Sequence, residues 1–321
     1  MPQQHQQIAA TTKKKEKELA RQHNITVVQE LTPEERSAVG YANATLIQGT
    51  FPYRKTTDHI HTVKNGNLTI TMSSVNGLPY GVYPRLIMCW LVKAAQMNHL
   101  DYDKTDPERL RISFGTNLAA FMRDVGIDTR YGKNSTSDRA RDQLLRLFST
   151  TLSVQRDYTH DGDNITTGHM TLIGKAWKFR WNSEDPHRFL HDSHVILTEE
   201  FFDMLVNNAV PIDMDIVRHI KSSVIALDVF MWLSYRFSYL RRPTIVPLTQ
   251  LMQQFGTKMD PQDPVARRNF TVKLKKAIAK IHEIWPDAKV SVLDGGKGLM
   301  LKPTAPSVRR KNRRKITRNT K

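Results

Sequence analysis

The sequence predicts an α+β fold, because one arrangement of helices and strands occurs twice along its 321 residues. Each copy has a short helix, then a basic helix whose charges lie opposite its apolar stripe, then a hairpin. Helix, turn, basic helix and hairpin together describe a winged helix, a helix-turn-helix variant whose second helix enters a groove of DNA. A chain of this length can bury two ordinary cores. We therefore expect two tandem winged-helix domains.

The clearer copy lies at residues 248–302. Its run "PLTQLMQQFG" predicts a short helix that Gly256 ends. A long amphipathic run follows and predicts a helix that Pro286 ends. The run "KVSVLDGGKGLML" then predicts two strands joined by a glycine turn at residues 294–297.

The long helix of this copy has an apolar side and a basic side. Its apolar positions are Phe270, Leu274, Ala277, Ile278 and Ile281. Arginines in the first turn suit guanine edges in the major groove, whereas lysines further along suit phosphates. The predicted DNA-contacting residues of this copy are Arg267, Arg268, Lys273, Lys275, Lys276, Lys280 and, at the turn, Lys297.

The first copy has the same order but a weaker charge pattern. "TNLAAFMRDVG" predicts a helix that Gly126 ends, and "STSDRARDQLLRLFS" predicts the basic helix. The apolar stripe of the basic helix is Ala140, Leu144, Leu147 and Phe148, and its candidate DNA contacts are Arg139, Arg141 and Arg146. Arg139 and Arg146 are expected to point away from the stripe. "TTLSVQRDYT" and "HMTLIGKAWKFRW" are the expected hairpin. Because Asp138 and Asp142 dilute the positive charge, this surface is equally well explained as a protein-interaction surface.

Further elements surround the two copies. A strand is expected at "GNLTITMSS", a buried helix at "YPRLIMCWLVKAAQMN" and a short strand at "RLRISFG". Three helices are expected at "LTEEFFDMLVNNA", capped by Thr198, at "PIDMDIVRHIKSS", and at "SSVIALDVFMWLSYRFSYL". Asp228 and Arg236 within the last of these favour a buried core helix over a membrane span, since a charge at mid-bilayer costs several kcal/mol.

The composition divides the chain into four parts. Residues 1–35 are polar and are expected to be disordered. Residues 36–186 are expected to form the first winged-helix domain, a candidate for dimerisation and DNA contact. Residues 187–303 are expected to form the second, the main DNA reader. Residues 304–321 contain eight lysines or arginines and no acid, which predicts a flexible basic tail.

The charge and the cysteine content limit the function. A net charge of +17 favours a polyanionic partner, with duplex nucleic acid before an anionic membrane. The single cysteine, Cys89, excludes a disulfide framework and a thiolate metal cluster, which fits a reducing cytosol. The N-terminal run has no apolar segment of the kind that directs secretion. We therefore expect a cytoplasmic DNA-binding protein.

Catalytic motifs are weak. His59-Ile60-His61 matches the short metal-binding pattern of rolling-circle nickases, but it lies in a polar segment with poor strand character. His187, His191 and His194 have spacings that one helical face could direct at zinc, although a solvated linker explains them better. The sequence has no phosphate-binding GxxxxGK[ST] loop. We therefore expect no enzyme activity, no cofactor and no metal.

Several runs resemble the RepA-type plasmid replication initiators. The LPYG-x-x-PR run lies in "GLPYGVYPRLIMCWLVKAA" from Gly77, and the ALD-x-F-x-WL-x-YR run lies in the segment from Leu197. Both are long enough to be specific. "FGTNLAAFMRDVGI" from Phe114 and "QLMQQFG" from Gln250 belong with them. The resemblance covers roughly residues 75–303.

The resemblance implies an initiator that binds repeated sites at its plasmid's origin, helps to open an AT-rich region, and recruits the host helicase and host initiator proteins. It also implies tandem winged helices, and a homodimer that represses its own promoter and so controls plasmid copy number. The family has no catalytic residues to carry over. Its DNA-contacting positions map by motif onto the helices at residues 139–146 and 267–280.

The expected function is therefore that of an origin-binding initiator without enzyme activity. One alternative is a plasmid-encoded transcriptional regulator that binds DNA without opening it. The other is a nickase that uses His59 and His61.

Overall fold

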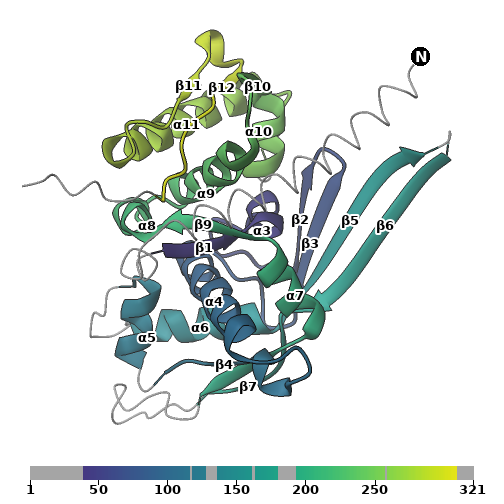
Figure 1. Ribbon diagram of the computed structural model, residues 1–321. Helices are drawn as coiled ribbons and strands as arrows, with labels where there is room; N and C mark the ends of the chain where they lie inside the picture. Colours follow the sequence, from purple (N-terminus) through teal and green to yellow (C-terminus); the bar gives the residue numbers. More distant parts are fainter. Residues whose placement is uncertain are drawn as a thin grey trace, which may run out of the picture.

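The computed structural model describes residues 39–115, 118–127, 136–160, 163–179, 193–256 and 259–308. This part of the chain contains both helices and antiparallel strands, so the predicted α+β class is confirmed (Figure 1). The predicted disordered segment at residues 1–35 and most of the predicted basic tail lie outside the described residues. The same is true of His187 and His191, two of the three histidines considered and rejected as zinc ligands.

The first described residues form a connecting layer between two larger units. β1 (Val39–Asn43) pairs antiparallel with β9 (Ala209–Asp213), and α3 (Ala44–Gln48) follows β1 directly. In Figure 1 these elements lie between a lower group of helices around α4 and an upper group around α11. The helix predicted at "PIDMDIVRHIKSS" is therefore partly wrong. Its first residues pair with β1, and only α8 (Met214–Ile220), capped by the Asp213 side chain, is helical.

The lower group, here called the first unit, begins with a long buried helix. A strand, two helices and two further strands follow, and the strand order in its sheet is β4-β8-β7. Its elements are α4 (Val82–Asp101), η1 (Pro107–Leu110), β4 (Arg111–Ser113), α5 (Leu118–Val125), α6 (Thr136–Phe148), β7 (Gly174–Lys178) and β8 (His194–Leu197).

The upper group, here called the second unit, repeats this order of elements. Its sheet has the order β10-β12-β11, so in both units the last strand lies between the first and the second. Its elements are α9 (Val224–Tyr239), β10 (Thr244–Pro247), α10 (Leu248–Phe255), α11 (Pro264–Ile284), β11 (Val290–Val292), η2 (Asp294–Gly296) and β12 (Gly298–Leu301). The predicted short helix, basic helix and hairpin at residues 248–302 are confirmed.

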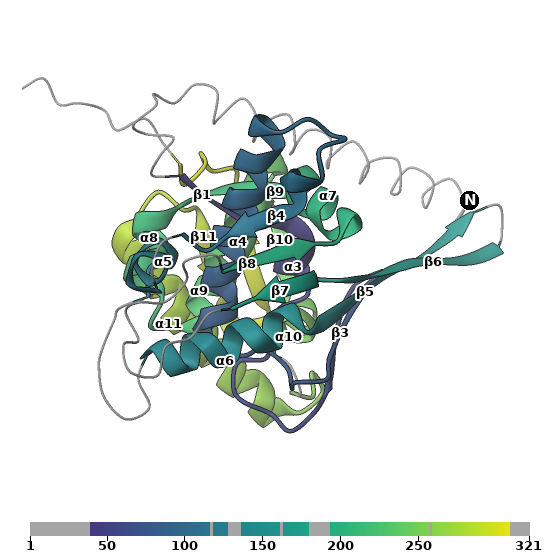
Figure 2. The ribbon, with the colours of Figure 1, turned by 90° about the horizontal axis from the view of Figure 1, so that it is seen from below.

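The hairpin predicted after the basic helix of the first unit exists but belongs to a different sheet. The strands β2 (Ile60–Asn65), β3 (Leu68–Ser74), β5 (Thr150–His160) and β6 (Asp163–Leu172) pair in the order β2-β3-β5-β6. The β5–β6 end of this sheet projects from the body (Figures 1 and 2). The strands that correspond to the hairpin of the second unit are β7 and β8.

The chain passes from one of these sheets to the other at Gly174, where its backbone lies close to Phe148. The predicted continuous strand "HMTLIGKAWKFRW" is interrupted after Leu172, and the chain enters the other sheet at Gly174. A Cβ atom at Gly174 would lie 3.2 Å from both the Cβ and the carbonyl oxygen of Phe148 at the end of α6. A residue with a side chain would crowd this crossing, so glycine fits it.

One cluster of buried apolar residues runs through both units. In the first unit, Phe114 stacks on Trp90 and meets Phe121 and Phe148 edge to face. The predicted apolar stripes of α6 and α11 are buried, which confirms both. The division predicted between residues 186 and 187 stays a prediction; β8, beyond it in the chain, pairs with strands of the first unit.

The apolar segment around Asp228 is the buried helix α9, as predicted. Within the described part of the chain, no helix is long and apolar enough to cross a membrane. The helix predicted after Thr198 is α7 (Glu199–Asn207), and the Thr198 hydroxyl accepts a hydrogen bond from the Phe201 amide as expected.

The end of the described chain is packed against its beginning. Val308 is 7% exposed and lies against Val39, and the neighbouring Ser307 hydroxyl faces that of Ser234. The first residues of the predicted tail, 304–308, are therefore part of the folded body. The start of the basic tail was predicted at residue 304 because this stretch is short and contains a proline, Pro306.

Candidate nucleic-acid interface and the joint between the units

The helix α11 is held by one face and exposes the other. Its N-terminus is capped by Asp263, whose carboxylate accepts hydrogen bonds from the amides of Val265 and Ala266 at 2.9 and 3.2 Å. The apolar stripe packs on α9 and α8. Four predicted DNA-contacting residues are exposed on α11: Arg268, Lys273, Lys275 and Lys276. Because the stripe fixes the rotation of the helix, these cations face solvent together.

Two other predicted contacts of α11 are engaged with the protein. Arg267 is half-buried and donates from Nη1 to the carbonyl oxygen of Pro261 at 3.2 Å. Lys280 donates from Nζ to the hydroxyl of Ser222 at 3.1 Å. Both side chains would have to leave these partners, at a modest cost, to contact DNA.

The glycine turn brings one more cation to the side of α11. Gly295 and Gly296 have φ values of 67° and 65°, a region that favours glycine. A Cβ atom at Gly296 would lie 3.0 Å from Oγ1 of Thr271, so the turn packs against α11. Lys297 is exposed on this turn. We call Arg268, Lys273, Lys275, Lys276 and Lys297 the basic surface of the second unit.

In the first unit the three predicted arginines of α6 have different environments. Arg139 and Arg141 are exposed. The side chain of Arg146 is only 12% exposed, with Nε 2.8 Å from both carboxylate oxygens of Asp142. Its guanidinium also lies over the ring of Tyr80. Arg146 was expected to point away from the apolar stripe of its helix, and on that side the segment that precedes α4 covers it.

The strand β7 carries exposed cations that are absent from the DNA contacts predicted from the sequence. Lys175 and Lys178 are exposed, and Trp177 between them is 38% exposed. Lys175 and Lys178 were missed because the hairpin was predicted at the residues of β5 and β6, whereas the hairpin of this unit is β7 and β8. The sequence signal for β7 is Gly174, which follows the buried Ile173 and after which the alternating pattern restarts.

The histidines of the nickase alternative have structural partners. His61 is buried in β2, and its Nε2 lies 2.9 Å from the carbonyl oxygen of Thr50. Nδ1 of His59 lies 2.8 Å from the carbonyl oxygen of Ser74. The strand β2 begins at Ile60, so the expected poor strand character is wrong from that residue onward. His194 lies against the guanidinium of Arg111, and the described residues contain no group of three side chains that could hold a metal ion.

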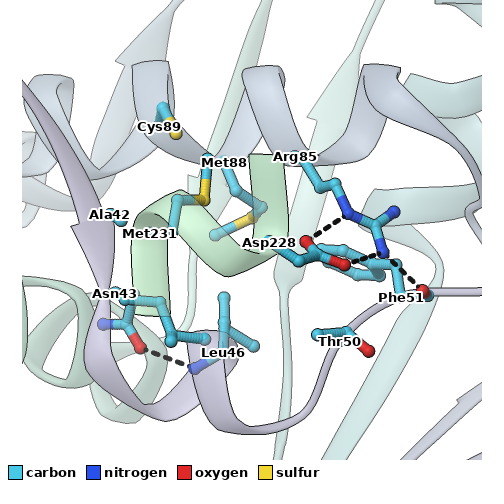
Figure 3. Close-up of a pocket in the computed structure, with 11 residues that line it drawn as sticks. Ala42, Asn43, Leu46, Thr50, Phe51, Arg85, Met88, Cys89, Asp228 and Met231 are labelled. Atoms are coloured by element: carbon cyan, nitrogen blue, oxygen red, sulfur yellow. Dashed lines mark hydrogen bonds and ion pairs between the residues drawn. The ribbon is translucent and has the colours of Figure 1, made fainter. Parts of the chain in front are cut away.

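A buried ion pair joins the first helices of the two units (Figure 3). Arg85 of α4 donates from Nε and Nη2 to the two carboxylate oxygens of Asp228 of α9, at 2.6 and 2.8 Å. Both side chains are at most 5% exposed. The same guanidinium donates to the carbonyl oxygens of Gly81 and Phe51 at 2.6 and 2.7 Å. We call Arg85, Asp228 and the loop at residues 49–53 the joint.

A small cavity lies beside the joint, lined in part by Met88, Cys89 and Met231. Burial, and to a smaller extent the charge of Asp228, raises the pKa of the Cys89 thiol to about 12. Burial is also the main reason that the pKa of the Tyr53 hydroxyl is well above its ordinary value. Both groups therefore stay protonated and neutral at physiological pH.

Cys89 should resist alkylation in the folded protein at pH 8. The thiolate is the reactive form, and a raised pKa keeps its fraction far below that of an exposed cysteine, while burial blocks the reagent. Mass spectrometry after iodoacetamide treatment would check this, with the urea-unfolded protein as the positive control. Modification at equal rates in the folded and unfolded protein would contradict the buried placement.

Taken together, the fold and the exposed cations define an α+β protein with two similarly built units, each with a helix that carries exposed basic residues. The family model described as plasmid-encoded RepA protein matches residues 78–245. The chain therefore belongs to this family of RepA-type replication initiators, and the resemblance inferred from its sequence runs is confirmed.

Two solved structures are similar to this chain. The selenomethionine form of domains 2 and 3 of RctB shares 12% identity and covers 82% of this chain and 97% of its own, with a TM-score of 0.49. A second structure of RctB domains 2–3 shares 11% identity with the same coverages and a TM-score of 0.45. Similarity at this level carries no functional argument. No curated protein matches the chain.

Proposed function

We propose that this protein initiates plasmid replication by binding repeated duplex sites in the plasmid origin through two winged-helix units. The observation that carries the proposal is the repeated architecture. Each unit has the order helix, strand, helix, helix, strand, strand, with the last strand between the other two. In a winged helix the third helix of this order enters the major groove and the last hairpin lies beside it.

The exposed charges agree with this assignment. In the second unit the third helix is α11, and its exposed face carries Arg268 and three lysines, with Lys297 on the adjacent turn. In the first unit the third helix is α6, with Arg139 and Arg141 exposed, and the hairpin strand β7 adds Lys175 and Lys178. The second unit has the denser charge, so we assign it the main role in DNA reading.

Arg268 and Lys276 should have different roles in binding. Arg268 lies near the N-terminus of α11, the end at which this motif normally meets base edges. Arg268→Ala should therefore cost about 1–3 kcal/mol at the specific site and relax the preference at one base pair. Lys276 lies further along and should contact phosphate. Lys276→Ala should weaken binding to all sequences alike and flatten the salt slope by about one unit.

Titration of both variants against specific and scrambled duplexes at two salt concentrations measures this difference. Arg146→Ala serves as the comparison in the first unit, because its guanidinium is covered and paired with Asp142. Equal losses on both duplexes for Arg268→Ala would assign that residue to phosphate contact. A loss of specificity in Arg146→Ala alone would place the main reader in the first unit.

The family supports initiation over the alternative of a transcriptional regulator. We propose that the protein opens an AT-rich segment and recruits the host helicase and host initiator proteins, acts without enzyme activity of its own, and represses its promoter as a homodimer. Permanganate probing of supercoiled origin DNA separates the two functions. Protein-dependent unpairing supports an initiator, whereas binding without unpairing favours a regulator. Metal-dependent strand cleavage would instead establish the nickase.

A further inference from the structure

A continuous path of buried and half-buried hydrogen bonds connects the basic helix of the first unit to the joint. On α6, the side-chain oxygen of Gln143 accepts from the Tyr80 amide at 2.8 Å, and Arg146 donates to the carbonyl oxygen of Leu78 at 3.4 Å. Leu78 and Tyr80 belong to the segment before α4, and the carbonyl oxygen of Gly81, which follows Tyr80, accepts a hydrogen bond from Arg85. The segment before α4 thus holds α6 on one side and the joint on the other.

The path continues from the joint to the helix that precedes α11. Arg85 binds the carbonyl oxygen of Phe51 in the loop after α3. In the same loop the Thr50 hydroxyl donates to the carbonyl oxygen of Gln254 on α10 at 3.3 Å. The Gln254 side chain donates back to the carbonyl oxygen of Ile47 at 2.9 Å and is itself buried. Because α10 packs on α11, both basic helices are tied to the same joint.

Stability alone is a poor explanation for the ion pair at the centre of this path. Removing two charges from water is costly, and well-packed apolar side chains of similar volume are often as stable or more stable in such a position. The arrangement of Arg85 differs from an apolar contact in its directionality. A planar guanidinium with a two-point contact to one carboxylate and further bonds to two carbonyl oxygens permits only one orientation of its partners.

We propose that Arg85 and Asp228 are positioning residues that fix the distance and rotation between α6 and α11, so that the protein selects duplexes whose two contact regions have one particular spacing. The inference rests on the proposed two-unit DNA binding. The runs that carry the family resemblance fit this role: LPYG-x-x-PR contains the segment before α4 and Arg85, ALD-x-F-x-WL-x-YR contains Asp228, and "QLMQQFG" contains Gln254.

The test uses the double variant Arg85→Met/Asp228→Leu, which replaces the ion pair by apolar side chains. Its DNA is an origin repeat located by footprinting with the unaltered protein, together with a version carrying five inserted base pairs between the two protected regions. This insertion rotates one region by about half a turn. The insertion should weaken binding of the unaltered protein by about tenfold or more, the size of a lost base contact. It should weaken binding of the double variant by no more than about twofold.

Arg109→Met is the matched control. Arg109 is also a buried arginine, but its partners Glu199 and Asp203 lie on α7, away from the joint. This variant should keep the full penalty for the insertion. If the double variant also keeps that penalty, the positioning role is wrong while the proposed function stands. If the unaltered protein binds no origin duplex specifically, or tolerates the insertion, the two-unit binding mode itself fails.

A distance measurement gives a readout that does not depend on DNA. Spin labels attached through Arg139→Cys on α6 and Ala279→Cys on α11 occupy exposed positions, whereas Cys89 is buried. The protein with the Arg85–Asp228 ion pair intact should give one narrow distribution of distances between the two labels. The double variant should give a broad one. Asp228→Asn keeps the side-chain volume, and its distance distribution should have an intermediate width. This variant provides the test if the double variant does not fold. Identical distributions in all three proteins would overturn the proposal.

Discussion

Raising the salt concentration from about 50 to 200 mM should weaken duplex binding by a factor on the order of 10³–10⁵. The chain carries a net charge of +17, and both basic helices expose cations that suit phosphates. Each phosphate that the protein neutralises releases condensed counterions, so affinity falls steeply as salt rises. The expected loss corresponds to a footprint of about 6–10 phosphate contacts.

Fluorescence anisotropy with a labelled origin duplex over a series of salt concentrations measures this slope. Lys276→Ala provides an internal control, since it should remove one contact and reduce the slope by about one unit. An affinity that changes less than about tenfold over this range would mean that the basic surfaces are solvated faces rather than DNA contacts.

Replacing Arg85 alone by alanine should lower the free energy of unfolding by about 3–5 kcal/mol. The substitution leaves the carboxylate of Asp228 buried without its cation and removes the donor for the carbonyl oxygens of Gly81 and Phe51. An unpaired buried charge is the most costly of these consequences. This loss should far exceed that of Arg139→Ala, an exposed position on α6.

Urea unfolding followed by circular dichroism measures the change. The double variant Arg85→Met/Asp228→Leu should recover most of the lost stability, because it removes the uncompensated charge together with its partner. A loss in Arg85→Ala no larger than that in Arg139→Ala would contradict the buried pairing. Failure of the double variant to recover would mean that the hydrogen bonds to Gly81 and Phe51 dominate.

The elements that the sequence predicted well are those with local signals. The stripe of α11 from Phe270 to Ile281 follows helical spacing, Asp263 and Gly256 are ordinary helix-end residues, and the glycine turn before Lys297 marks a hairpin. Each signal lies within a few residues of the element that it predicts. The second unit was therefore predicted almost completely.

The elements that were missed depend on contacts between distant residues. The residues of β9 were expected to be helical. They form a strand because they pair with β1, and a pairing between segments about 170 residues apart leaves no local pattern in the sequence. The covered position of Arg146 depends on the segment that contains Leu78. The joint could not be predicted either, since Arg85 and Asp228 each lie in a run that reads as an ordinary buried helix. The resemblance runs marked these residues, and only the structure shows that they meet.

Footprinting on the plasmid's own origin DNA tests the central claim most directly. If the protein is a two-unit origin binder, hydroxyl-radical footprints at about 150 mM salt should show repeated protected sites, each covering two neighbouring major grooves on one face of the duplex. Arg268→Ala should weaken protection at all of these sites. Protection no stronger than on random DNA of the same length, or sites that cover a single groove, would contradict the account.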